Sequence, residues 1–83
     1  MNNRKPQIRE KILSLATECG HPDAALDDGA IIPQTGLLNS RAIIELVVWL
    51  EDTFDLDLDE DQITVENLGS VNAIAGFLAR ELG

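Results

Sequence analysis

The sequence contains one histidine and one cysteine, side chains often used as general base and as nucleophile. A catalytic or metal-binding role for the only histidine, His21, would need partners of the right type close in space, so we predict a solvated loop residue. The only cysteine, Cys19, lies on an apolar helical stripe, where a thiol usually serves as a small buried hydrophobic group. We therefore predict no catalytic residue, and the chain is not expected to be an enzyme.

An acidic run offers a possible metal site. Asp55, Asp57 and Asp59 match the first three ligands of a calcium-binding loop, and Glu66 falls at its twelfth position. The sixth position of such a loop turns sharply and is normally glycine, but here it is Glu60. This mismatch favours a solvated acidic linker, and no metal site is predicted.

Ser40 stands at the start of the strongest predicted helix. Serine is common at this place because its hydroxyl can accept a hydrogen bond from a backbone N–H of the first turn, so capping is the default interpretation. The unpaired N–H groups and the positive end of the helix dipole also favour a phosphate attached to the residue. A phosphorylated or phosphodiester-linked Ser40 is the alternative, and its surroundings decide between the two.

Apolar periodicity predicts the helices that hold Ser40 in place. One helix runs from Pro6 until Gly20 ends it, and a second runs over residues 40–54. A short helix follows its cap Thr64, and a last one follows its cap Ser70. The core-facing stripes are Ile8, Ile12, Leu15, Ala16 and Cys19; Ile43, Leu46, Val47, Leu50 and Phe54; and Val71, Ile74, Leu78 and Leu82.

The segments between these helices have no helical period. Residues 21–39 hold two prolines and two glycines and are predicted to form a long loop with a turn after Asp23. Its apolar residues should pin it against the core; they are Ile31, Ile32, Leu37 and Leu38. Residues 55–59 alternate like a strand, but no partner strand is present, so an extended connection is predicted. The predicted fold class is all-α: a four-helix bundle, with three longer helices and one short helix, in a single domain over residues 1–83.

Composition limits the possible functions. The chain has 83 residues, of which 45% are apolar and 25% charged, and this is too small for a deep catalytic cavity with a rigid shell. A formal net charge of −9 would repel nucleic acids and anionic membranes, so neither is an expected partner. The single cysteine fits a reducing compartment, and no signal peptide or membrane span is evident. We therefore expect a cytoplasmic monomer.

The sequence around Ser40 resembles the carrier-protein family, which includes acyl, peptidyl and aminoacyl carriers. The resemblance rests on Gly36-Leu37-Leu38-Asn39-Ser40, the amphipathic helix after it, the acidic linker and the segment over 63–68 with the final helix. It implies a four-helix bundle of the acyl-carrier-protein type, in which Ser40 receives 4′-phosphopantetheine from coenzyme A through a phosphopantetheinyl transferase. The thiol of this arm would hold a carboxyl group as a thioester for delivery to partner enzymes.

Two residues beside the serine depart from the family's pattern. Asn39 replaces the usual aspartate, and Arg41 stands where the family generally has an apolar residue that touches partner enzymes. Asn39 can still hydrogen-bond and cap locally. Arg41 places a positive charge beside the attachment site and favours a partner with an acidic feature there. These departures indicate a dedicated loading ligase rather than a housekeeping synthase set.

The exposed side of the helix after Ser40 is the predicted partner surface. Ile44 and Val48 lie one turn apart beyond the core stripe and are flanked by acids, which fits transient docking. The predicted partner-binding residues are Asn39, Arg41, Ile44, Glu45, Val48, Glu51 and Asp52. The alternative is that Ile44 and Val48 only border the core and that the acids form a solvated face.

Three functions remain open at this point. The leading hypothesis is a free-standing aminoacyl carrier that a dedicated amino acid:carrier-protein ligase (an adenylating enzyme) loads and a downstream enzyme unloads, because residues 36–40 look most like those of small single-amino-acid carriers. A carrier for fatty-acid or polyketide synthesis is the second, and it would need shelter for an acyl chain between the helices. An unmodified helical adaptor, with Ser40 as a simple cap, is the third.

Overall fold

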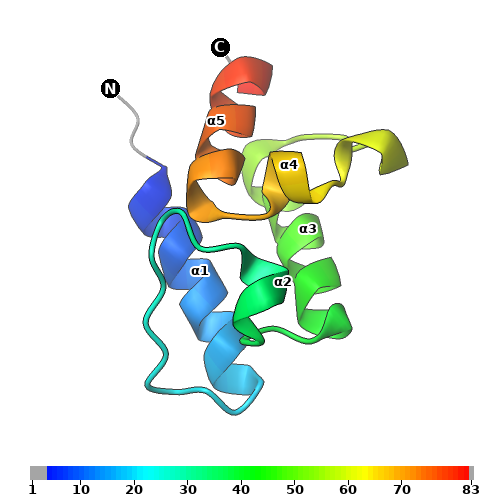
Figure 1. Cartoon of the computed structure of the whole chain (residues 1–83). Helices are drawn as coiled ribbons and strands as arrows, with labels where there is room; N and C mark the ends of the chain where they lie inside the picture. Colours follow the sequence, from blue (N-terminus) through cyan, green and yellow to red (C-terminus); the bar gives the residue numbers. More distant parts are fainter. Residues whose placement is uncertain (1–3, 83) are drawn as a thin grey trace.

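A computed structural model describes residues 4–82 of the chain (Figure 1). Its elements in chain order are α1 (Lys5–Glu18), α2 (Ile32–Thr35), α3 (Ser40–Phe54), the 3₁₀ turn η1 (Glu60–Gln62), α4 (Val65–Leu68) and α5 (Val71–Leu82). The part of the chain described contains no strand, so the all-α prediction is confirmed. The three long helices are the three that were predicted, and α4 is the predicted short one.

The short helix α2 lies inside the segment that was predicted to be a loop. Pro33 stands in its first turn, and Gly36 ends it with a φ of 71°, a left-handed conformation that glycine adopts without strain. A turn was predicted after Asp23, and the structure has one on either side of this position: the N–H of Ala24 donates to the carbonyl of His21 at 3.2 Å, and the N–H of Ala30 donates to the carbonyl of Asp27 at 3.1 Å. A helix of four residues is too short to show a period of 3.6, which is why the periodicity did not reveal it.

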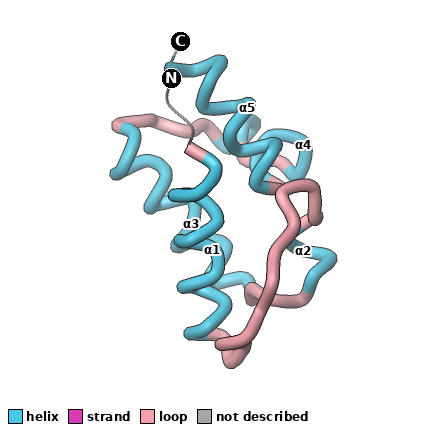
Figure 2. The backbone as a smooth tube through the Cα atoms, turned by 90° about the vertical axis from the view of Figure 1, so that its left-hand side faces the viewer, coloured by secondary structure: helices cyan, strands magenta, loops and turns pink. Residues whose placement is uncertain are grey.

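The loop before α2 runs back along α1 and is fixed at its far end (Figure 2). Arg9 of α1 forms an ion pair with Asp28, and the N–H of Asn72 donates to the carbonyl of Asp28 at 2.9 Å. The N–H of Ile32 donates to the carbonyl of Gly69 at 2.7 Å. The loop therefore holds α2 against the junction of α4 and α5, in agreement with the prediction that it packs on the core.

The core lies where α1 packs against α3 and α5. Its buried apolar residues are Ile8, Ile12, Leu15, Ala16, Ile32, Leu38, Ala42, Leu46, Leu50, Leu68, Val71, Ile74, Phe77 and Leu78. Cys19 is only half-buried, and Leu82 is exposed, so the predicted stripes extend one residue too far in α1 and in α5. Phe77 is the core residue that the predicted stripe of α5 omitted; it lies three residues after Ile74 on the same face.

Side-chain caps begin the last two helices, and an extended connection precedes them. As predicted, Thr64 Oγ1 accepts from the N–H of Asn67 at 3.1 Å, and Ser70 Oγ accepts from the N–H of Ala73 at 3.0 Å. The connection after α3 is extended, and Leu56 and Leu58 pack against the core while the aspartates that alternate with them, at 55, 57 and 59, are exposed. This arrangement explains a strand-like alternation without a strand.

Replacement of Leu46 by alanine should lower the free energy of unfolding by roughly 2–4 kcal/mol, because its side chain is buried in the middle of α3. Chemical denaturation followed by circular dichroism measures the change. Ile44→Ala on the same helix is the matched control and should have little effect, since Ile44 is 63% exposed. A Leu46→Ala midpoint equal to that of the control would contradict the position of Leu46 in the core.

Candidate functional site

Ser40 is exposed at the first residue of α3, at the end of the bundle where α1 finishes (Figure 1). Asn39, not Ser40, is the N-cap: its backbone is extended, and its Oδ1 accepts from the N–H of Ala42 at 2.8 Å. The default interpretation of Ser40 as a cap is therefore wrong, whereas a capping role for Asn39 was foreseen. The hydroxyl of Ser40 has no hydrogen-bond partner within residues 4–82.

The surroundings of this hydroxyl favour negative charge although the chain as a whole is acidic. The N–H groups of Ser40 and Arg41 belong to the first turn of α3, where no earlier helical carbonyl can pair with them. The positive end of the helix dipole adds to their effect. The Arg41 side chain is 90% exposed and has only a loose contact with Glu45, at 3.9 Å between Nε and Oε1. A phosphate joined to Ser40 would meet these donors, so the residues present fit a phosphodiester.

The predicted partner surface is exposed along most of its length. Ile44 is 63% exposed and Val48 48%, which is more than residues at the edge of a core would show. Arg41, Glu45 and Asp52 are exposed as well.

Two members of the predicted set also hold the fold together. Asn39 caps α3, and Glu51, which is only partly exposed, accepts from the N–H of Leu58 at 3.1 Å through Oε2. Glu51 was predicted as an exposed rim acid; in the structure it fixes the segment after α3 because that segment folds back over the helix end.

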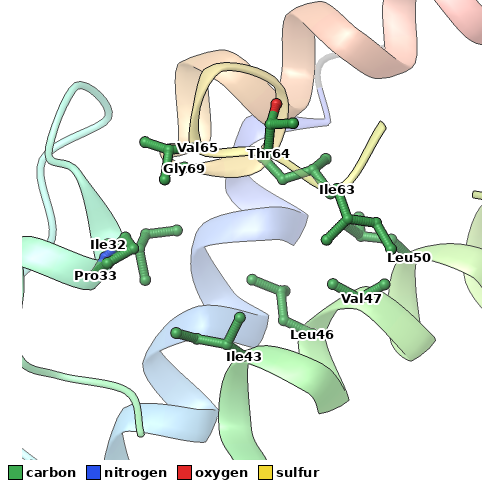
Figure 3. A pocket seen from close by; sticks show the side chains of 11 residues that line it. Ile32, Pro33, Ile43, Leu46, Val47, Leu50, Ile63, Thr64, Val65 and Gly69 are labelled. Carbon is green, nitrogen blue, oxygen red and sulfur yellow. The ribbon is translucent and has the colours of Figure 1, made fainter. Parts of the chain in front are cut away.

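An apolar cavity of about 140 Å³ lies between α2, α3 and α4 (Figure 3). It is lined by Ile32, Pro33, Ile43, Leu46, Val47, Leu50, Ile63, Thr64, Val65, Leu68 and Gly69. The sequence did not reveal this cavity because one wall is α2, which no periodicity predicts. Gly69 forms part of the wall where a Cβ atom would come within 2.3 Å of the carbonyl oxygen of Val65, so the chain needs glycine there.

A second hollow, of about 290 Å³, lies against the opposite face of α3. It is lined by Leu15, Glu18, Cys19, Asn39, Arg41, Ala42 and Glu45. The hollow therefore lies between the end of α1 and the start of α3, and it touches both residues that flank Ser40. Cys19, predicted as core filler, thus packs against the core on one side and borders this hollow on the other.

His21 is exposed in its loop, as predicted. Over residues 4–82, the structure brings together no group of three or more histidine, cysteine or acidic side chains that could hold a metal ion. In the same range no helix is both long enough and apolar enough to cross a membrane.

Replacement of Asn39 by alanine should cost about 1 kcal/mol of stability, because the N–H of Ala42 loses its partner. Asn39→Asp is the matched control and should preserve stability, since a carboxylate also accepts this bond and suits the helix dipole. Ser40→Ala should change stability little. Thermal or urea unfolding measures all three, and a larger loss in Ser40→Ala than in Asn39→Ala would return the capping role to Ser40.

Comparisons with known proteins agree with this arrangement. Residues 12–78 match the family model described as the phosphopantetheine attachment site. The chain is 30% identical over 87 aligned residues to aminoacyl carrier protein 2 of Bradyrhizobium diazoefficiens, with 100% of this chain and 96% of the relative covered. Its fold is similar to the solution NMR structure of a holo acyl carrier protein from Nitrosomonas europaea, with a TM-score of 0.72, 22% identity and 98% of each chain covered.

These matches confirm an acyl-carrier-protein fold and a carrier, rather than catalytic, role with covalent 4′-phosphopantetheine. Partners of such carriers include phosphopantetheinyl transferases and synthetase enzymes. The chain belongs to the phosphopantetheine-attachment family and is a carrier protein of the acyl or aminoacyl type.

Proposed function

We propose that Ser40 carries the 4′-phosphopantetheine arm and that the chain holds an amino acid on it for delivery to partner enzymes. The observation that carries the proposal is the exposed, unpaired hydroxyl of Ser40 beside free backbone N–H groups. Because Asn39 supplies the cap, the helix end does not need this hydroxyl, and modification leaves α3 intact.

The chain's own residues act by position and charge. The N–H groups of Ser40 and Arg41, together with the guanidinium of Arg41, would hold the phosphodiester at the start of α3. When bound, the arm supplies a terminal thiol that binds a carboxyl group as a thioester. Tethering to Ser40 keeps the cargo at high local concentration near a docked enzyme, so this small chain contributes delivery and recognition.

An amino acid is the proposed cargo, and a dedicated amino acid:carrier-protein ligase is the proposed loading enzyme. Similarity over the whole length to an aminoacyl carrier protein supports the cargo. Arg41 supports the dedicated ligase, because an exposed cation beside Ser40 suits an acidic groove in a partner. In this proposal the chain acts as a single-domain monomer in the cytoplasm.

A short acyl chain is the second candidate cargo, and the apolar cavity favours it (Figure 3). An apolar cavity of about 150 Å³ holds one benzene molecule, so the 140 Å³ here would accommodate about six carbons. Long fatty acyl chains would need the helices to move apart. An adaptor that lacks the arm does not agree with the chain's family. Thioester capture with amino acids, fatty acids and their ligases distinguishes the two cargo classes.

Incubation of the purified chain with coenzyme A and a broad-specificity phosphopantetheinyl transferase should add one phosphopantetheine group, which intact-mass spectrometry detects. Ser40→Ala should remain unmodified because its hydroxyl is the acceptor. Ser14→Ala, at an exposed serine of α1, is the control and should be modified at the wild-type rate. No mass increase with several transferases, or an increase that persists in Ser40→Ala, would refute the proposed attachment.

Val48→Asp should lower kcat/KM for loading by the cognate ligase at least about tenfold, because a carboxylate would enter the apolar centre of the proposed docking surface. Circular dichroism and modification of Ser40 should stay close to wild type. Leu82→Asp is the control and should be loaded at the wild-type rate, since Leu82 is an exposed apolar residue of α5 that belongs neither to that surface nor to the cavity.

Two variants of Arg41 test, in the same loading assay, whether the ligase recognises the positive charge at this position. Arg41→Glu should slow loading, whereas Arg41→Leu should broaden acceptance by foreign synthases. Wild-type loading rates for both variants would place Arg41 outside the interface.

A further inference from the structure

We propose that the hollow between the end of α1 and the start of α3 binds the α-ammonium group of the amino acid carried by this protein. This inference rests on the proposed function and deepens it, because it assigns to the chain itself a site that prefers amino acids to acyl groups. The ligand class is a small aminoacyl group with a free α-ammonium.

The position of the hollow makes it reachable from Ser40. Asn39 and Arg41, the two neighbours of Ser40, both line it, so an arm on Ser40 starts at its rim. A volume of about 290 Å³ exceeds what a small amino acid needs. A flexible arm can fold back toward its own attachment point, and short tethers give local concentrations in the millimolar range. A weak site is therefore sufficient for substantial occupancy.

The charges that face the hollow favour a cation. Its charged side chains are the carboxylates of Glu18 and Glu45 and the guanidinium of Arg41. Arg41 meets Glu45 only loosely, at 3.9 Å, and Glu18 has no ion-pair partner among residues 4–82. Glu18 is also the last residue of α1, whose last turn has no basic residue to offset the negative end of the helix dipole. The α1 side of the hollow therefore lacks the positive charge that an α-ammonium would bring.

The two helix ends complement the two charges of an aminoacylated arm. The start of α3 and Arg41 favour the phosphate, and the end of α1 with Glu18 favours the ammonium. Leu15 and Ala42, which are buried, give the hollow an apolar floor against which the α-carbon can pack. An acyl group brings no charge to this hollow, and the apolar cavity on the other face of α3 suits it better.

Two arms that differ only in charge test the site. The isotope-labelled full chain is modified on Ser40 with non-hydrolysable amide analogues of the arm that end in glycyl or in propionyl. These groups have the same number of heavy atoms, and an ammonium in one replaces a methyl in the other. Relative to propionyl, the glycyl arm should shift the backbone amide NMR signals of Glu18, Cys19, Arg41 and Glu45.

Variants then assign the effect to the carboxylates. Glu18→Gln should reduce the glycyl-specific shifts by about half or more, because it removes one of two anions that face the hollow. Glu45→Gln should act in the same direction. Glu10→Gln is the matched control, since Glu10 is exposed on the same helix and outside the hollow, and it should leave the shifts unchanged.

The outcomes separate this inference from the proposed function. Intact mass reports whether Ser40 has taken the arm, and a chain that takes none overturns both proposals. A modified chain with the same spectrum for glycyl and propionyl arms overturns the ammonium site alone. Glycyl-specific shifts that remain complete in Glu18→Gln and in Glu45→Gln overturn it as well.

Discussion

The hydrogen bond from the N–H of Ala42 to Oδ1 of Asn39 is the interaction on which the site depends. It places the N-cap at Asn39, one residue before Ser40, so Ser40 is the first helical residue of α3 instead of the cap. A serine that capped α3 would turn its hydroxyl toward the helix and occupy it. With Asn39 in that role, the hydroxyl is exposed and the first N–H groups of α3 remain available. An amide side chain achieves this as well as the family's usual aspartate because both present an oxygen acceptor.

The residues of α3 fall on three faces of the helix that differ in their surroundings. Leu46 and Leu50 are buried in the bundle, Ile44 and Val48 are exposed, and Arg41 borders the hollow beside the end of α1. The rigid placement of α3 comes from elements that are distant in sequence. Ile32 binds the carbonyl of Gly69, and Asp28 joins α1 to the start of α5. Glu51 adds a link from α3 to the segment after it. These links fix the position of α3, and with it the position of Ser40 at its first residue.

The sequence predicts the features that depend on local periodicity and fails where tertiary contacts decide. The helices around Leu15, Leu46 and Ile74 follow from apolar stripes, and the caps Thr64 and Ser70 follow from residue type. The short helix α2 exists because Ile32 bonds to Gly69, a contact 37 positions away in sequence that no local pattern reveals. The apolar cavity depends on α2 and was missed for the same reason.

At the site itself, residue type alone could not decide between Asn39 and Ser40, because both are good caps. The backbone decides: the extended conformation at Asn39 makes it the cap, and Ser40 is already helical. Glu51 shows the reverse case, since a charge predicted for a partner surface is used within the fold.

The hollows beside α3 are likewise a matter of tertiary structure that residue type alone does not reveal. Two hollows of opposite chemistry lie against opposite faces of α3, one apolar and one bordered by carboxylates. In the proposals above, the apolar hollow suits an acyl group and the carboxylate-bordered hollow suits an aminoacyl group. Glu18 and Arg41 are charges that the bundle does not need for its core, and they lie where an arm on Ser40 would begin.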